Sequence, residues 1–217
     1  GKLKLWRKLP PLIAIPTTAG TGSEVTAFSV ITDHSRNYKL TVVSNYLLPA
    51  YAILDPKLIS TVPEKTAAAC GIDAMVHALE AYISLAASPF SDVFAEKALK
   101  LIGANIRKYV ADRTDIAACE AMMVGSLFAG IAFSFARLGN VHAMSHPISA
   151  FFDVPHGVAN AIFLPIVVKY NALADDGKYL KIYNYIAKVK AYEDEFEPYM
   201  LVDLLLQLNE ELGIPGS

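Results

Sequence analysis

Three of the five histidines lie within fifteen positions of each other, in the run LGNVHAMSHPISAFFDVPHG at residues 138–157. His142 and His146 are four residues apart, so on a helix both imidazoles would share one face. His156 follows Pro155, where a turn would let its side chain swing back toward that helix. Imidazole nitrogen is a common ligand of transition metals, so this cluster predicts one wall of a metal pocket.

A carboxylate and a fourth imidazole occur earlier, in the run GIDAMVHALEAYIS. Asp73 and His77 are also four residues apart, a spacing at which two ligands of one metal can converge. Burying an unpaired polar group costs roughly 1–3 kcal/mol, and one divalent cation would satisfy most of these side chains together. Oxygen and imidazole ligands without thiolate suit Fe(II) or Zn(II). A structural network of hydrogen-bonded histidines is the alternative.

A second group of polar residues lies in IPTTAGTGSEVT, residues 15–26. Two glycines and several hydroxyls would let backbone and side chains approach a phosphate or ribose closely. Val25 stands where G-x-G-x-x-G has its third glycine, so a plain turn is the alternative. Lys39 opens a later strand and could add a cation, although such a lysine is usually solvated. The hydroxyls are those of Thr17, Thr18, Thr21 and Ser23.

The elements that must position these residues divide the chain near Pro63. Before it, short β-branched and aromatic runs predict strands in LIAIPT, AFSVIT, YKLTVVS and YAILDP. After it, apolar residues recur at helical spacing. The first helix should enter at Thr61 or Pro63. Further helices are predicted at about 92–110, 115–135, 141–151, 158–172, 179–189 and 198–212. We therefore expect an α/β part at residues 1–62 and a helical bundle at residues 63–217.

Composition narrows the class of protein. The 217 residues are 54% hydrophobic and 18% charged, which argues against a disordered chain or a coiled coil. A net charge of -2 offers no electrostatic surface for nucleic acid. Cys70 and Cys119 stand far apart, so we expect buried thiols and no disulfide or CxxC site.

Targeting signals are not evident in the sequence. The longest uncharged apolar stretch, residues 121–136, falls short of the roughly 20 residues that span a bilayer. The first twelve residues carry basic side chains but no long apolar run with a cleavage site, so a signal peptide is not expected. We expect a soluble cytoplasmic protein without a membrane partner.

The three runs IPTTAGTGSEVT, GIDAMVHALEAYIS and ARLGNVHAMSHPISAFFDVPHGVANAIFLP, in this order and spacing, resemble the iron-containing (group III) alcohol dehydrogenases. The resemblance extends from about Leu12 to at least Val168. It implies a two-domain architecture like that of dehydroquinate synthase, with a dinucleotide-binding α/β domain, an all-helical domain and a catalytic metal between them. The implied reaction moves a hydride between NAD or NADP and a small primary alcohol or aldehyde.

The resemblance also assigns roles to individual residues. It implies that Fe(II), or Zn(II), is held by Asp73, His77, His142 and His156. His146 would transfer protons near the substrate. The cofactor would lie against Thr17, Thr18, Thr21, Ser23 and Lys39. Four phenylalanines near these motifs could line an apolar substrate pocket, but we expect them in the core: Phe133, Phe135, Phe151 and Phe152.

Some alternatives remain open at this stage. The family's G-G-G-S type loop is absent, so the resemblance implies an incomplete dinucleotide-binding domain and a chain that lacks both ends. A metalloenzyme like glycerol dehydrogenase or dehydroquinate synthase is one alternative. An inactive metal-binding fragment is another. A mean hydropathy of +0.36 predicts apolar surface that a partner copy could cover, so we expect a homo-oligomer, most simply a dimer.

Overall fold

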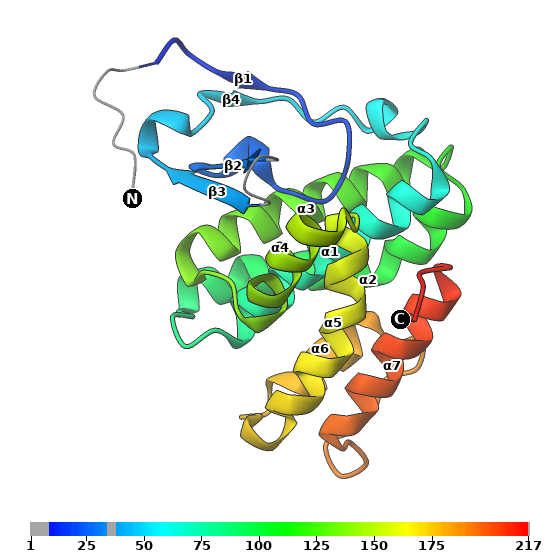
Figure 1. The fold of residues 1–217 in the computed structure, drawn as a ribbon. Coiled ribbons are helices and arrows are strands. Elements are labelled where there is room, and N and C mark those ends of the chain that lie inside the picture. The colour runs from blue at the N-terminus through cyan, green and yellow to red at the C-terminus, as the bar shows by residue number, and fades with distance from the viewer. Residues whose placement is uncertain (1–8, 34–37, 217) are drawn as a thin grey trace.

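The computed structural model describes residues 9–33 and 38–216, except for the side chain of Lys39. Two small sheets lie together on one side of a helical bundle, and the N-terminal half of the bundle lies nearest to them (Figure 1). Helices α5, α6 and α7 extend away from the sheets. The predicted arrangement, strands first and helices after, is thus present in the described residues.

The strands form two separate pairs. β1 (Ile13–Ala14) pairs in parallel with β4 (Tyr51–Ala52), while β2 (Phe28–Asp33) pairs antiparallel with β3 (Tyr38–Val43). Each of the four predicted runs contains a strand. β1 and β4 are only two residues long, whereas β2 and β3 have six residues each.

Seven α-helices follow in the described residues, and each lies within three residues of a predicted boundary. Their bounds are α1 Glu64–Ile83, α2 Pro89–Ala111, α3 Ile116–Ala136, α4 Asn140–Phe152, α5 His156–Asn171, α6 Lys178–Ile186 and α7 Pro198–Glu211. Short 3-10 turns at Ser23–Val25 and Asn45–Leu47 lie between strands, Pro56–Ile59 leads from β4 to α1, and Ala172–Ala174 extends α5.

Capping residues explain the helix starts that differ from the prediction. α2 begins at Pro89 because Ser88 forms a reciprocal capping box with Ser91, and proline is well suited to the first helical position. α5 begins at His156, directly after Pro155. The expectation that His156 lies in a turn before the helix is therefore wrong, since its imidazole projects from the first residue of α5.

α1 is the central helix of the bundle and packs against α2, α3 and α5. Fifteen of its twenty residues are buried, and many of them are alanines that allow close approach. α5 crosses it so tightly that a Cβ on Gly157 would lie 2.2 Å from the carbonyl oxygen of Ala69. This crossing fixes the start of α5, and with it His156.

A hydrogen bond from α7 compensates for a proline inside α5. Pro165 lies inside α5 and has no N–H for the carbonyl of Ala161, four residues earlier. The buried amide of Asn209 on α7 donates to that oxygen instead, at 2.7 Å. The backbone acceptor that the proline leaves open is thereby satisfied by a neighbouring helix.

Two expectations about apolar residues need correction. α3 and the segment 156–174 are long and apolar enough to cross a membrane by length and composition, although the sequence stretch at 121–136 was expected to fall short. This is weak evidence for a membrane span, because 56% of the α3 window is buried inside the bundle. Cys119 is buried as predicted, but Cys70 is only partly buried; both thiols are free.

Replacing Asn209 with alanine should destabilise the bundle, because the Ala161 carbonyl would remain buried without a donor. We expect a loss of about 1–3 kcal/mol in the free energy of unfolding, measured by urea denaturation. Glu210→Ala, at an exposed position of the same helix, is the matched control. Equal stability of the two variants would contradict the role given to Asn209.

Candidate metal centre and cofactor loop

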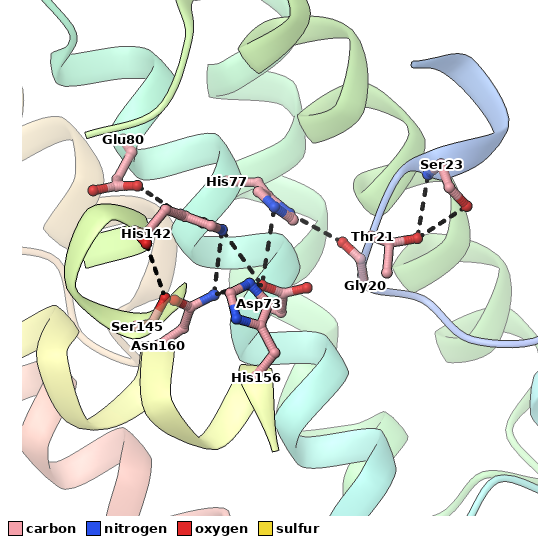
Figure 2. Close-up of polar contacts among 10 residues, drawn as sticks. All are labelled: Gly20, Thr21, Ser23, Asp73, His77, Glu80, His142, Ser145, His156 and Asn160. Carbon is pink, nitrogen blue, oxygen red and sulfur yellow. Dashed lines mark hydrogen bonds and ion pairs between the residues drawn. The ribbon is translucent and has the colours of Figure 1, made fainter. Parts of the chain in front are cut away.

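Three imidazoles surround a single carboxylate oxygen. The Nε2 atoms of His142, His156 and His77 lie 3.7, 3.8 and 3.9 Å from Oδ1 of Asp73 (Figure 2). In a tetrahedral site with bonds of about 2.1 Å, neighbouring ligand atoms lie about 3.4 Å apart. Ligand atoms of Asp73, His77 and His142 all lie within 4.8 Å of one another and could hold one ion, and His156 approaches the same oxygen of Asp73 as a fourth.

Three helices bring these ligands together. Asp73 and His77 are buried one turn apart on α1, as the sequence spacing predicts. His142 comes from the first turn of α4 and His156 from the first residue of α5. The site thus depends on where α4 and α5 begin relative to the middle of α1.

Glu80 sets the start of α4 and was not recognised in the sequence. Its Oε1 accepts the backbone N–H of Val141 at 2.7 Å, and its Oε2 accepts Nδ1–H of His142 at 2.7 Å. The carboxylate is buried, three residues after His77 on α1. Because Nδ1 of His142 carries the proton, a neutral ring presents the Nε2 lone pair to the cluster. A glutamate three residues after His77 on the same helix was the available sequence signal.

Gly20 fixes the second imidazole. Nδ1–H of His77 donates to the carbonyl oxygen of Gly20 at 3.2 Å, which again leaves Nε2 for the cluster. Gly20 belongs to the hydroxyl-rich loop, so this bond connects the loop directly to the carboxylate–histidine cluster. Every residue has a backbone carbonyl, so nothing in the sequence indicates this contact, and only the three-dimensional structure shows it.

Asn160 on α5 is a further buried residue that the sequence analysis missed. Its amide nitrogen donates to Oδ1 of Asp73 at 2.6 Å and lies 3.3 Å from Nε2 of His142 and 3.2 Å from Nε2 of His156. Its Oδ1 is buried without a hydrogen-bond partner among the described residues. The amide therefore places a partly positive group where the ligand lone pairs converge, as expected where a cation fits.

The pKa shifts of the buried residues also favour a cation at this cluster. Burial lowers the pKa of His77 to about 4, although Asp73 partly offsets the effect. Burial also disfavours a charged His142, but Asp73 and Glu80 outweigh it and raise its pKa to about 9. Burial raises the pKa of Asp73, yet the histidines, His77 first, hold it below its usual range. The buried cluster therefore carries two carboxylates and one imidazolium, and a divalent cation in place of that proton would neutralise it.

The cluster opens into a cavity of about 790 Å³. Alternate residues of the β2–β3 hairpin cover one side of it, among them Phe28, Val30 and Thr32. His146 lies in the lining, with its ring centroid 5.0 Å from that of His156 and 5.9 Å from that of His142. The predicted proton-transfer residue is thus in the same cavity as the predicted ligands.

The structure separates the predicted cofactor residues into two groups. Thr21 and Ser23 line the cavity, and the Thr21 hydroxyl is hydrogen-bonded to both the hydroxyl and the backbone N–H of Ser23. Thr17 and Thr18 are not among the described residues that line it, and Thr18 contacts the thiol of Cys70. The side chain of Lys39 lies outside the described residues; its backbone pairs with Thr32.

The expectation that four phenylalanines belong to the core is correct only for Phe133. This ring is buried, lines the cavity and stacks on His77 with a centroid distance of 4.6 Å. Phe135, Phe151 and Phe152 are 59%, 63% and 72% exposed, so they belong neither to the core nor to the lining. Phe135 still makes an edge-to-face contact with Phe90 of α2, at a centroid distance of 4.9 Å.

The fold and the site define a helical protein whose histidine–carboxylate cluster shares a cavity with a hydroxyl-rich loop. Two family descriptions match the chain. "Fe-containing alcohol dehydrogenase family, C-terminal" matches residues 67–217, and "Iron-containing alcohol dehydrogenase" matches residues 1–56. The chain therefore belongs to the iron-containing alcohol dehydrogenase family.

Individual relatives agree with this assignment. The chain is 41% identical over 212 residues to 1,3-propanediol dehydrogenase of Citrobacter freundii, covering 97% of this chain and 55% of the relative. It is 41% identical to lactaldehyde reductase of Escherichia coli K12, covering 94% and 53%. A solved alcohol dehydrogenase from Oenococcus oeni superposes with a TM-score of 0.93 at 37% identity, covering 100% and 57%. The chain thus spans about half the length of the curated relatives it matches.

The contact between the loop and the bundle can be tested through Cys70. Gly22 has a φ of 59°, and a Cβ on it would lie 2.7 Å from Cα of Gly130. A Cβ on Gly20 would lie 3.0 Å from Cβ of Cys70. Burial raises the pKa of Cys70 to about 11, so its alkylation by iodoacetamide should be slow at pH 7 and accelerate as the pH rises toward that value. Gly130→Val should displace the loop and increase the rate at least severalfold.

Cys119 provides the internal control for this experiment, because it is fully buried in α3. Mass spectrometry of the digested protein distinguishes the two thiols. Faster modification of Cys70 alone would indicate a local displacement of the loop. Unchanged reactivity of Cys70 in Gly130→Val would contradict the close contact.

Proposed function

We propose that this chain supplies the metal centre and part of the cofactor site of an NAD(P)-dependent oxidoreductase that interconverts small primary alcohols and aldehydes. The observation that carries the proposal is the arrangement of three imidazole Nε2 atoms around one oxygen of Asp73, inside a cavity that also contains Thr21 and Ser23. A Lewis acid beside a hydride acceptor is well suited to alcohol oxidation, since the first promotes loss of the hydroxyl proton and the second takes up the hydride.

Asp73, His77, His142 and His156 are the proposed ligands of Fe(II), with Zn(II) as the other metal that this donor set suits. When bound, the cation supplies Lewis acidity toward an alcohol or carbonyl oxygen. Glu80 and the Gly20 carbonyl orient two of the rings, and Asn160 holds the Asp73 carboxylate. These neighbours explain how the chain keeps the ligand atoms in position.

Other residues of the cavity prepare the reaction. Phe133 and the hairpin residues Phe28 and Val30 cover the cluster with apolar groups and limit the access of water. We assign proton transfer to a ring nitrogen of His146, since an imidazole beside the cluster in the same cavity can both accept and release a proton. Thr21 and Ser23 would offer hydroxyls to NAD or NADP.

The names of the relatives support a small alcohol or aldehyde as substrate. They include a 1,3-propanediol dehydrogenase, a lactaldehyde reductase and an NAD-dependent methanol dehydrogenase of Bacillus methanolicus. An NADPH-dependent butanol dehydrogenase of Clostridium saccharobutylicum is also among them, so both cofactors occur in relatives. None of these names decides between NAD and NADP for this chain.

We further propose that residues 1–62 belong to a dinucleotide-binding domain and residues 63–217 to the helical metal-binding domain. The change from strands to helices at Pro63 supports this division. Exposed apolar rings such as Phe151 and Phe152 favour self-association as a homodimer. A soluble cytoplasmic location, without membrane or nucleic acid partners, remains part of the proposal.

Metal analysis of anaerobically purified protein tests the ligand set. We expect about one iron or zinc per chain in the wild type, and loss of the metal in Asp73→Ala and His142→Ala. His146→Gln is the matched control, because it lies one helical turn from His142; it should keep the metal and lose NAD(P)-dependent turnover. A wild type that takes up neither metal when both are supplied would identify the cluster as a structural hydrogen-bond network and end the oxidoreductase proposal.

Glu80→Gln should weaken metal binding without removing a ligand. An amide can accept only one of the two hydrogen bonds that Glu80 receives, so His142 loses part of its orientation. We expect a 10-fold to 100-fold lower affinity, which is typical of such supporting residues, measured by competition with a chelator. Glu120→Gln, on the exposed face of α3, should bind as the wild type does. Equal affinities would show that Glu80 only caps α4.

A further inference from the structure

Arg137 has a backbone conformation that is almost restricted to glycine. It follows the last residue of α3, with φ 67° and ψ -177°. Residues with a Cβ rarely adopt this region, and its cost is accepted mainly at functional sites. The other described non-glycine residue with positive φ, Asp153, lies in the ordinary left-handed region at φ 55° and ψ 28°. Glycine would relieve the strain at position 137, so the arginine side chain needs another explanation.

Arg137 is exposed and is one of the residues that line the same cavity as the histidine–carboxylate cluster. It is the one lysine or arginine side chain in that lining for the part of the chain that the structure describes. Nearby lining residues include Phe133, Ser134 and Leu138, which carry no charge. No described residue forms an ion pair or hydrogen bond with the guanidinium. A favourable interaction with the C-terminal dipole of α3 would not require a residue at this strained position.

The charged groups that line the cavity favour an anionic ligand. Asp73 is the one carboxylate in its described lining, and its Oδ1 already faces three imidazoles and the amide of Asn160. A divalent cation at the cluster would neutralise Asp73 and Glu80, so the guanidinium of Arg137 would then give the cavity its excess positive charge. The guanidinium therefore has an unused, fork-shaped set of donors beside the reaction site, which matches a carboxylate, sulfonate or phosphonate in geometry.

We propose that Arg137 binds an acidic group of the substrate, so that the preferred substrate is a small alcohol or aldehyde with a carboxylate, sulfonate or phosphonate at its far end. This inference rests on the proposed oxidoreductase function and adds the chemical class of its substrate. In this arrangement the guanidinium selects the anionic end of the substrate while the cluster receives the reacting oxygen.

The test compares two aldehydes of equal chain length in the metal-loaded protein, succinic semialdehyde and butanal. Arg137→Met keeps a long side chain and removes the charge. The ratio of kcat/KM for the anionic over the neutral aldehyde should fall about 10-fold to 100-fold, as expected for a lost hydrogen bond to a charged group. Arg137→Lys should give an intermediate ratio. Arg137→Gly should lose the same preference while its melting temperature equals or exceeds that of the wild type.

Other results would overturn the inference. An unchanged ratio in Arg137→Met would show that no substrate anion meets the guanidinium. A higher KM for NADH or NADPH with both aldehydes alike would assign the side chain to the phosphates of the cofactor instead. A melting temperature of Arg137→Gly well below that of the wild type would indicate a structural role.

A binding measurement separates this inference from the oxidoreductase proposal. If neither aldehyde is turned over, the proposed function fails, and calorimetry with propane-1-sulfonate and butan-1-ol still examines Arg137. Wild-type protein should bind the sulfonate at least 10-fold more tightly than Arg137→Met does. Equal or absent sulfonate binding in the two proteins would contradict an anion site.

Discussion

The structure depends on one electrostatic constraint, the burial of Asp73 and Glu80 together with the imidazoles of His77 and His142. Charged groups taken out of water are tolerated only when every one of them has partners. Asp73 faces three imidazoles and an amide, and Glu80 accepts from a helix N-terminus and an imidazole. All of these contacts except that between Asp73 and His77 join segments that are far apart in the sequence, so satisfying the charges also assembles the fold.

Residues of α1 make these contacts with the neighbouring helices. Its buried face presents Asp73, His77 and Glu80 within two turns, and the last of these determines where α4 begins. α5 approaches as closely as its backbone permits, since Gly157 leaves no room for a side chain against Ala69. The ligand set is therefore a consequence of helix packing. A change in how α4 or α5 packs against α1 would move an imidazole away from Asp73.

The strand region contacts the histidine–carboxylate cluster as well as providing part of the proposed nucleotide site. Its loop reaches the cluster through the carbonyl of Gly20 and rests on α3 where Gly22 meets Gly130. Its hairpin covers the same cluster with alternate side chains. Because one cavity contains ligands, hydroxyls and an apolar cover, the two parts of the chain form a single site. The strained residue Arg137 lies where the end of α3 enters that cavity.

The sequence by itself determined the elements and the pairs of ligands on one helix. Hydrophobic periodicity located seven helices, and the spacing of Asp73 and His77 follows from helix geometry alone. Only the tertiary structure decided the partners. Glu80, Asn160 and the Gly20 carbonyl act across long sequence separations, and the exposure of Phe151 depends on which elements cover α4. The spacing of residues along one helix can be read from the sequence, whereas contacts between distant segments depend on packing that no short sequence pattern specifies.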